Sequence, residues 1–204
     1  RSKESFIIIN AALLKEKTYE KELFGEEFED GNISFGALER ANKGTLLIDE
    51  VSEIPYETQA NVLRVLIDQK FKRVNGSKDI NVNIRLISST SKDLNQAVRN
   101  NEFREDLFHR INVFPVTLPP LRDRKVDIPL LTYAIFKALK KKHNLGVTYI
   151  DPKAIDRLID YSWPGNVREL ENTLERALLI CNNKYLKEDD LGSVLDEKEK
   201  NIEP

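Results

Sequence analysis

The stretch TLLIDE at residues 45–50 decides the fold class, because a short and solidly apolar run ends there in two adjacent carboxylates. Continuous apolar runs rich in leucine and β-branched residues are typical of strands buried on both faces of a parallel sheet. The run FIII at residues 6–9 has the same character. We therefore predict that residues 6–9 and 45–49 form central strands of a parallel sheet.

Helical and extended patterns alternate through the first two thirds of the chain. Between Pro55 and Asp68 the apolar residues recur with helical spacing, and residues 84–89 have the pattern of a strand. Residues 71–74, a turn at residues 75–76 and residues 82–90 predict a hairpin. Strand, helix and strand in this order imply right-handed crossovers in a doubly wound α/β sheet, whose ligands bind beyond the carboxyl ends of the strands.

The last third has only the period of helices. Asp127 is placed to cap a first helix with Pro129 in its opening turn, and Gly146 stands where that helix should stop. Asp151 and the proline after it start a second helix, and the break at residues 164–166 separates it from a third. We expect these three or four helices to form a small lid.

These patterns divide the 204-residue chain into an α/β core over residues 1–126, an all-α lid over residues 127–191 and a linker over residues 192–204.

The composition excludes several classes of protein. The 32 Lys and Arg nearly balance the 34 Asp and Glu, which argues against a strongly basic nucleic-acid-binding surface and an acidic disordered tail. The single cysteine, Cys181, cannot form an internal disulfide, and it fits a reducing compartment. Without an apolar run of roughly 18–20 residues or a signal peptide, a cytoplasmic protein without membrane contact is expected. The absence of methionine, even at position 1, indicates a segment of a longer protein.

Asp49 and Glu50 lie where an apolar strand leaves its sheet. Burying acids is costly unless a cation or a reaction requires them there. In P-loop nucleotidases an acid at this point holds Mg²⁺, and a following glutamate orients or deprotonates the water that attacks the γ-phosphate. Asp49 would then hold the metal and Glu50 the water. The alternative is a strand that ends in a solvated turn.

Further motifs decide between these alternatives. In order along the chain they are ELFG at 22–25, GTLLIDE at 44–50, FREDLFHR at 103–110, LPPLR at 118–122 and WPGNVREL at 163–170. Together they resemble the AAA+ central domain of the NtrC-class bacterial enhancer-binding transcription activators, over about residues 6–191. The resemblance implies a P-loop-type parallel αβα sandwich whose N-terminal part is missing, a helical lid, and ATP and Mg²⁺ as cofactors.

The resemblance also assigns roles at the carboxyl ends of the strands. Asn10 matches the family's switch asparagine, which pairs with the catalytic glutamate, here Glu50. Thr90 and Ser91 match the sensor I position, where a short polar side chain bonds the attacking water or the γ-phosphate. Most members of the family have asparagine where this chain has Ser91.

Three arginines match cationic positions of the family. Arg104 and Arg110 match arginine fingers that reach into the neighbouring subunit's site, and Arg168 matches the sensor II arginine, which the lid directs at the phosphates of its own subunit. The planar and permanently charged guanidinium suits developing phosphoryl charge. Without the family, ion pairs of Arg104 and Arg110 with nearby acids such as Asp106 would be the favoured explanation.

Two features of the family are absent from this sequence. The P-loop pattern Gly-x-x-x-x-Gly-Lys-Ser/Thr does not occur, and the family places it just before Arg1, so this segment alone is expected to bind ATP weakly or not at all. The Gly-Ala-Phe-Thr-Gly-Ala loop that grips σ54 is replaced by a shorter acidic sequence at residues 26–35. That departure resembles the NtrX-type response regulators. It implies a receiver that a histidine kinase phosphorylates and a C-terminal helix-turn-helix that binds DNA, both outside this sequence.

Two hypotheses for the function follow. The first is an ATP-hydrolysing module of a two-component transcription regulator, which forms a homo-oligomer, either a ring or a dimer, through its nucleotide face. RNA polymerase is a candidate target, but σ54 is not expected to be one. The second is a catalytically silent scaffold for oligomerisation and switching. Nucleic-acid binding by the lysines of residues 137–143 is a weaker alternative, because such a helix face is usually only solvated. His109 and His143 lack ligand-spaced partners, so no structural zinc site is expected.

Overall fold

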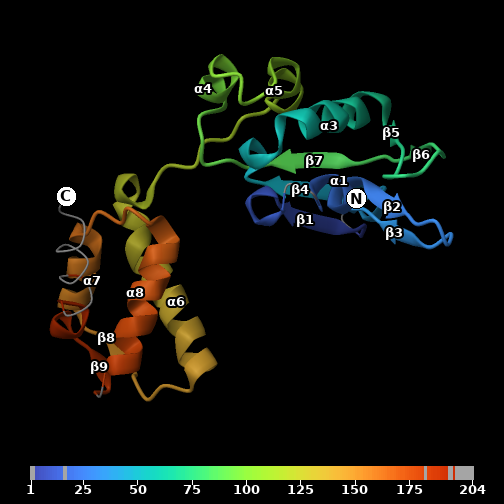
Figure 1. Cartoon of the computed structure of the whole chain (residues 1–204). Coiled ribbons are helices and arrows are strands. Elements are labelled where there is room, and N and C mark those ends of the chain that lie inside the picture. Colours follow the sequence, from blue (N-terminus) through green and yellow to red (C-terminus); the bar gives the residue numbers. More distant parts are fainter. Residues whose placement is uncertain (1–2, 16–17, 182, 193–194, 196–204) are drawn as a thin grey trace. The chain divides into compact units, whose positions relative to one another are not determined.

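A three-stranded parallel sheet forms the centre of the first part of the chain in this computed structural model (Figure 1). The strands, in their order across the sheet, are β1 (Phe6–Asn10), β4 (Thr45–Asp49) and β7 (Arg85–Ser88). The register sets Asn10 beside Asp49 and Ile48 beside Ser88. The carboxyl ends of all three strands therefore lie along one edge.

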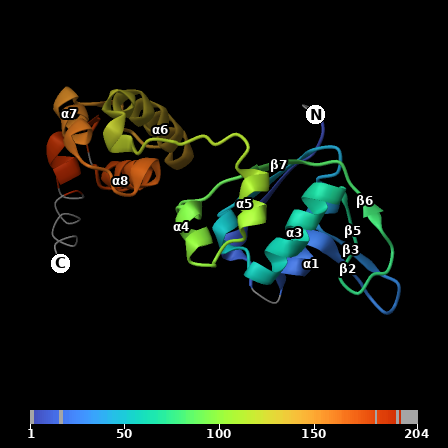
Figure 2. The same ribbon diagram turned by 90° about the horizontal axis from the view of Figure 1, so that it is seen from above.

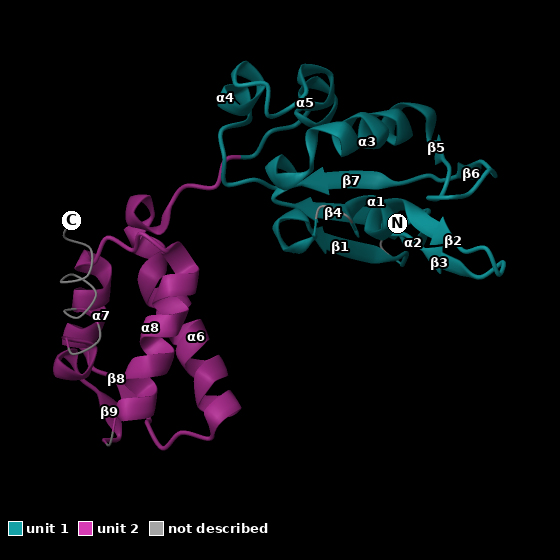
Figure 3. Cartoon of the chain, in the orientation of Figure 1, with its two compact units in different colours: residues 1–116 teal, residues 117–204 magenta. Residues whose placement is uncertain are grey.

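The chain divides into two units, residues 1–116 and residues 117–204 (Figure 3). The structure describes residues 3–15, 18–181, 183–192 and 195. Each unit encloses its own apolar core.

Strand β1 lies at one border of the sheet within the described residues, where it pairs with β4 alone. The prediction of a central strand is thus confirmed for β4 and wrong for residues 6–9. Phe6 and Ile8 are 56% and 61% exposed, whereas Ile9 is buried. Successive side chains of a strand point to opposite faces, so an apolar run does not reveal whether one face stays open.

Helix α3 (Tyr56–Asp68) confirms the helical spacing found in the sequence, because Val62, Val65 and Leu66 are buried. It ends at Gln69, whose left-handed backbone brings its N–H to the Val65 carbonyl. The shorter elements of this unit are helices α1 (Tyr19–Phe24), α2 (Ala37–Arg40), α4 (Leu94–Arg99) and α5 (Glu105–Ile111), and the 3₁₀ turns η1 (Ala11–Leu13) and η3 (Val51–Glu53).

Two short hairpins lie at the end of the sheet opposite the carboxyl ends of the strands, in both views (Figures 1 and 2). They pair β2 (Gly25–Glu27) with β3 (Ile33–Phe35), and β5 (Lys70–Phe71) with β6 (Ile80–Asn81). The hairpin predicted over residues 71–90 is therefore wrong in its second arm, and its first arm is Lys70–Phe71 and not residues 71–74. The return strand is β6, and β7 instead pairs in parallel with β4, on the side of β4 opposite β1.

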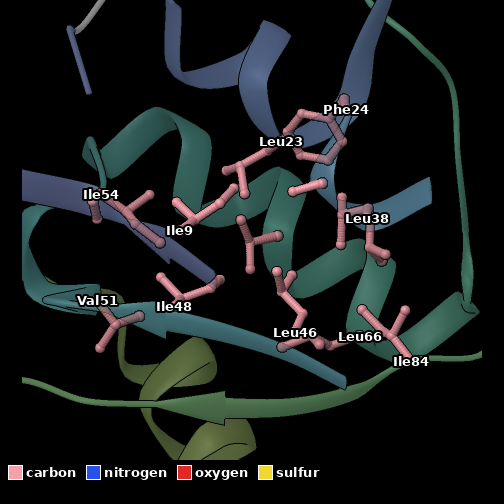
Figure 4. Packing of buried hydrophobic residues seen from close by; sticks show 14 of the residues in the cluster. Ile9, Leu23, Phe24, Leu38, Leu46, Ile48, Val51, Ile54, Leu66 and Ile84 are labelled. Atoms are coloured by element: carbon pink, nitrogen blue, oxygen red, sulfur yellow. The ribbon is translucent and has the colours of Figure 1, made fainter. Parts of the chain in front are cut away.

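The core of the first unit forms between the sheet and its helices (Figure 4). Leu46 and Ile48 are 0% and 1% exposed and lie among buried side chains such as Leu23, Leu38 and Leu66. Truncating one such leucine to alanine typically costs about 2–5 kcal/mol. This packing fixes β4, and therefore the position of Asp49 at its end and of Glu50 directly after it.

The second unit is built from helices α6 (Ile128–His143), α7 (Pro152–Asp160) and α8 (Asn166–Ile180), preceded by the 3₁₀ turns η4 (Leu121–Asp123) and η5 (Lys125–Asp127). The predicted cap of α7 is confirmed, because the Asp151 carboxylate accepts the Lys153 N–H. Asp127 directly precedes α6 as predicted, but the prediction that it caps the helix is wrong, because its side chain forms no capping hydrogen bond and its backbone is already helical. Trp163 is fully buried and donates its indole N–H to the Leu158 carbonyl at 2.7 Å. Its role is packing, as expected.

The second unit differs from its prediction in three details. Helix α6 ends at Asn144 in a left-handed conformation and not at Gly146. A short parallel pair, β8 (Tyr149–Ile150) and β9 (Tyr185–Leu186), was not predicted. Within the expected linker, residues 193–194 and 196–204 lie outside the described residues, while Leu195 is buried in the lid core. No helix in the described part of the chain has the length and apolar character needed to cross a membrane.

Candidate functional site

Polar side chains gather where the three parallel strands end. Asn10 closes β1, Asp49 closes β4 and is followed by Glu50, and Thr90 and Ser91 follow β7. The hydrogen bonds described next link them across the strands. This carboxyl edge is where open parallel sheets bind their ligands.

Asp49 is held from both neighbouring strands. One carboxylate oxygen accepts the Asn10 side-chain amide at 2.9 Å, and the other accepts the Ser89 hydroxyl at 2.6 Å. The expected pairing of Asn10 with Glu50 is therefore not the contact in this structure. Strand register explains the difference, since Asn10 lies directly beside Asp49 in the parallel ladder. Each oxygen keeps a lone pair for a cation or a water.

Glu50 has a left-handed backbone, with φ 53° and ψ 55°. For a residue other than glycine such a conformation costs about 1–3 kcal/mol and is concentrated at functional sites. Its carboxylate accepts two hydrogen bonds from Ser91, from the backbone N–H and from the hydroxyl, both at 3.0 Å. This strained residue thus carries an acid whose orientation Ser91 fixes.

Thr90 and Lys92 complete this edge. The Thr90 hydroxyl donates to the Ser52 hydroxyl at 3.1 Å and accepts the Lys92 N–H at 3.1 Å. Lys92 forms an ion pair with Glu53 at 2.7 Å, and this hydrogen-bonded partner raises the lysine pKa, with a smaller contribution from the charge of Glu50. The sequence reasoning missed Lys92 and Ser89. Ser89 could have been found from its place after a strand neighbouring β4, whereas nothing in the sequence marked Lys92.

The two arginines expected to act as arginine fingers lie at α5: Arg104 directly precedes the helix and Arg110 lies within it. Arg104 precedes the helix and donates through Nε and Nη2 to both oxygens of Asp106, at 3.1 and 2.8 Å. Arg110 donates to the Leu66 carbonyl, near the end of α3, at 2.8 Å. No hydrogen bond joins either arginine to Asp49 or Glu50 in the described part of the chain, so within one copy they do not complete the carboxyl edge.

Arg168 lies in the first turn of α8, in the second unit, and is exposed. A cation in the first turn opposes the helix macrodipole, which favours acids at that end. Helix stability therefore does not explain this arginine. Its exposed charge remains available to an anion.

The donors at the carboxyl edge fit Mg²⁺ bound together with a nucleotide. Mg²⁺ prefers oxygen ligands and is usually bound through one or two carboxylates, with phosphates and waters completing its shell. Asp49 supplies such a carboxylate, oriented by two donors and half-buried. Among the described residues no group of three or more His, Cys, Asp or Glu side chains could hold a metal by itself.

The segment expected to carry the σ54-gripping loop forms the β2–β3 hairpin. Its turn is closed by the Phe28 N–H donating to the Asn32 carbonyl at 2.9 Å. Arg73, after β5, ties the hairpin to α2 because it bonds both Glu27 and Glu39 at 2.7 Å. A hollow of about 470 Å³ lies between the hairpins, at the end of the sheet opposite the acids of the carboxyl edge (Figure 1).

Comparison with known proteins identifies this arrangement. Residues 1–117 match the family model described as the Sigma-54 interaction domain. The chain belongs to the sigma-54 interaction domain family. Residues 122–204 match a second model, the AAA+ ATPase lid domain. The resemblance to NtrC-class regulators and the α/β fold with its helical lid are thereby confirmed.

Relatives of this sigma-54 interaction domain are transcription regulators. The chain is 43% identical over 195 residues to the regulatory protein AtoC of Escherichia coli, covering 94% of this chain and 42% of that protein. It is 41% identical to the nitrogen assimilation regulatory protein NtrX of Azorhizobium caulinodans, covering 89% of this chain and 40% of that protein. A crystal structure of NtrX from Brucella abortus in complex with ATP superposes with a TM-score of 0.86 at 39% identity, covering 96% of this chain and 44% of that chain. The chain therefore spans less than half the length of these relatives.

Proposed function

We propose that this domain binds ATP with Mg²⁺ and hydrolyses it between neighbouring copies of the chain, within an NtrX-like two-component transcription regulator. The observation that carries the proposal is the strained Glu50, whose carboxylate is held by two hydrogen bonds from Ser91. It directly follows Asp49, whose carboxylate accepts one hydrogen bond on each oxygen. The NtrX of Brucella abortus, solved with ATP and with ADP, supports the choice of nucleotide. A receiver served by a histidine kinase and a DNA-binding helix-turn-helix would complete the regulator.

The residues of the carboxyl edge divide the chemistry between them. Asp49 would hold Mg²⁺, which when bound would supply positive charge to neutralise the phosphates. Glu50 accepts a proton from the attacking water or orients it, while Ser91 and Thr90 keep the acid and the neighbouring loop in place. Arg168 would add a cation from the lid. Arg104 and Arg110 of the next copy would stabilise the negative charge that develops on the phosphates in the transition state. An arginine finger of this kind contributes ~10³ to 10⁵ in rate.

We further propose that the output does not pass through σ54. The β2–β3 hairpin has the acidic sequence EEFEDGNISF at residues 26–35 in place of the gripping hexapeptide, and its turn is closed by its own backbone hydrogen bonds. RNA polymerase reached by another contact remains the candidate target. An open-complex assay with σ54 holoenzyme and the full-length protein tests this part, and ATP-dependent opening would overturn it.

The decisive experiment uses Glu50→Gln in the full-length protein. We expect ATP affinity to stay within about twofold and turnover to fall at least ~10²-fold, because the amide cannot accept the proton of the water. Glu57→Gln, an exposed glutamate in the first turn of α3, is the matched control and should keep wild-type turnover. Equal turnover of Glu50→Gln and wild type would remove Glu50 from the mechanism.

The second candidate is a silent scaffold that oligomerises and switches without hydrolysis. It is favoured by the acidic sequence that replaces the σ54-gripping loop at residues 26–35, because that departure indicates a changed output. Nucleotide binding by the full-length wild type without turnover at any protein concentration would support the scaffold. Turnover that rises cooperatively with protein concentration would support sites shared between copies.

A further inference from the structure

Gln59 is a polar side chain buried completely in the first unit. It lies in α3 and is 0% exposed. Its amide nitrogen donates to the Ile54 carbonyl at 2.9 Å and to the Glu102 carbonyl at 3.1 Å, and its oxygen accepts the Arg104 N–H at 2.8 Å. Both amide hydrogens and the carbonyl are therefore used, as a buried amide requires.

These three bonds join two segments that the proposed mechanism needs together. Ile54 closes η3, the turn that begins directly after Glu50. Arg104 is the residue directly before α5. Gln59 thus links the segment behind the catalytic acid to the backbone of the first finger, through contacts that skip more than forty positions of sequence.

Tyr56 lies one turn before Gln59 on the same side of α3, as residues three apart do. Its ring centroid is 5.6 Å from the Arg104 guanidinium carbon, within cation–π range. Asp106 takes the Nε and Nη2 side of the same guanidinium. Among the described residues no hydrogen bond uses Nη1, so one edge of the group stays open to an anion.

We propose that Gln59 and Tyr56 are positioning residues for Arg104: Gln59 fixes its backbone and Tyr56 fixes the face of its guanidinium, so that the open edge is presented in one geometry to the phosphates bound by a neighbouring copy. The inference rests on the proposed function. Neither residue touches nucleotide. A finger ordered in advance loses less conformational freedom when it engages the transition state.

The first test compares Tyr56→Leu with Tyr56→Phe in the full-length protein. The leucine removes the aromatic face, and kcat should fall about fivefold with KM for ATP unchanged, because the guanidinium loses the cation–π contact that orders it. The phenylalanine keeps the face and should retain wild-type kcat. Tyr133→Leu, a similarly exposed tyrosine of α6 in the second unit, is the control and should change neither constant.

The second measurement does not depend on activity. In the full-length protein labelled with ¹⁵N-arginine, the Nε–Hε resonance of Arg104 should move toward the position of a free arginine in Tyr56→Leu, and should stay near its wild-type position in Tyr56→Phe and Tyr133→Leu. An unchanged resonance in Tyr56→Leu overturns the inference, and so does an equal loss of kcat in the leucine and phenylalanine variants. If the full-length protein has no turnover, the proposed function fails and the resonance alone decides the positioning.

Gln59→Met removes the three hydrogen bonds at nearly constant length. Its turnover should fall and should recover when it is mixed with Glu50→Gln, because the Glu50→Gln copy contributes an intact finger to the intact Glu50 of the Gln59→Met copy. A purely structural role of Gln59 would leave the mixture as inactive as its parts. Should Gln59→Met not fold, the Tyr56 pair still decides.

Discussion

At the scale of single residues, Glu50 is where backbone preference and chemistry conflict. Glycine adopts the left-handed conformation without the strain that other residues carry. We predict that Glu50→Gly is more stable than Glu50→Ala by about 1 kcal/mol, because both lack the carboxylate and only the alanine retains the strain. Urea unfolding of the two variants measures this difference, and equal midpoints would mean that the turn is unstrained.

Asp106 supplies a prediction on pH. The hydrogen bond from the Arg104 guanidinium holds the pKa of Asp106 below its usual range, which is about 4. A lowered folded-state pKa means that the stabilisation is present above the unfolded pKa and is lost as pH falls through the folded value. A ¹³C titration of the Asp106 carboxylate should give this low pKa, and in Arg104→Ala the pKa should rise toward the ordinary value. The same pKa in both proteins would contradict the pairing.

At the scale of elements, helix α7 depends on its first residues. The Asp151 carboxylate caps the helix through the Lys153 N–H at 2.9 Å, and Pro152 occupies the first turn. Asp151→Ala should lower the free energy of unfolding by about 1 kcal/mol, whereas Asp151→Ser, which keeps a capping oxygen, should lower it less. Asp156→Ala, an exposed position of the same helix, is the control for lost charge. Equal effects of the alanine and serine variants would argue against the cap.

The elements found from the sequence are those with enough residues to display a period. Helices α3, α6 and α8 were predicted because each spans several turns with an apolar face. The three small strand pairs have only two or three residues per strand, so no alternation can be seen in them. At the site, Asp49 and Glu50 were predicted from the apolar strand that they end. The pairing of Asn10 with Glu50 came from the family resemblance, and the strand register instead places Asn10 beside Asp49.

At the scale of the assembled molecule, the prediction concerns copies of the chain acting together. Arg110→Ala in the full-length protein should lose turnover and regain a substantial fraction when mixed with Glu50→Gln, because one copy then supplies the acid and the other the finger. Arg99→Ala, an exposed arginine at the end of α4, should need no rescue. Failure of the mixture would point to the bond between Arg110 and the Leu66 carbonyl, and so to a role in holding α3 within one copy.

The fully buried Trp163 makes the tryptophan fluorescence of this chain report on one of its two units. It is the one tryptophan of the 204 residues, and it lies in the core of the second unit with Tyr161 at 4.9 Å between ring centroids. Tryptophan fluorescence therefore reports on the unfolding of the lid and does not report on the sheet that carries Asp49 and Glu50. A melting curve recorded by fluorescence and one recorded by circular dichroism will agree only if the two units lose their structure together.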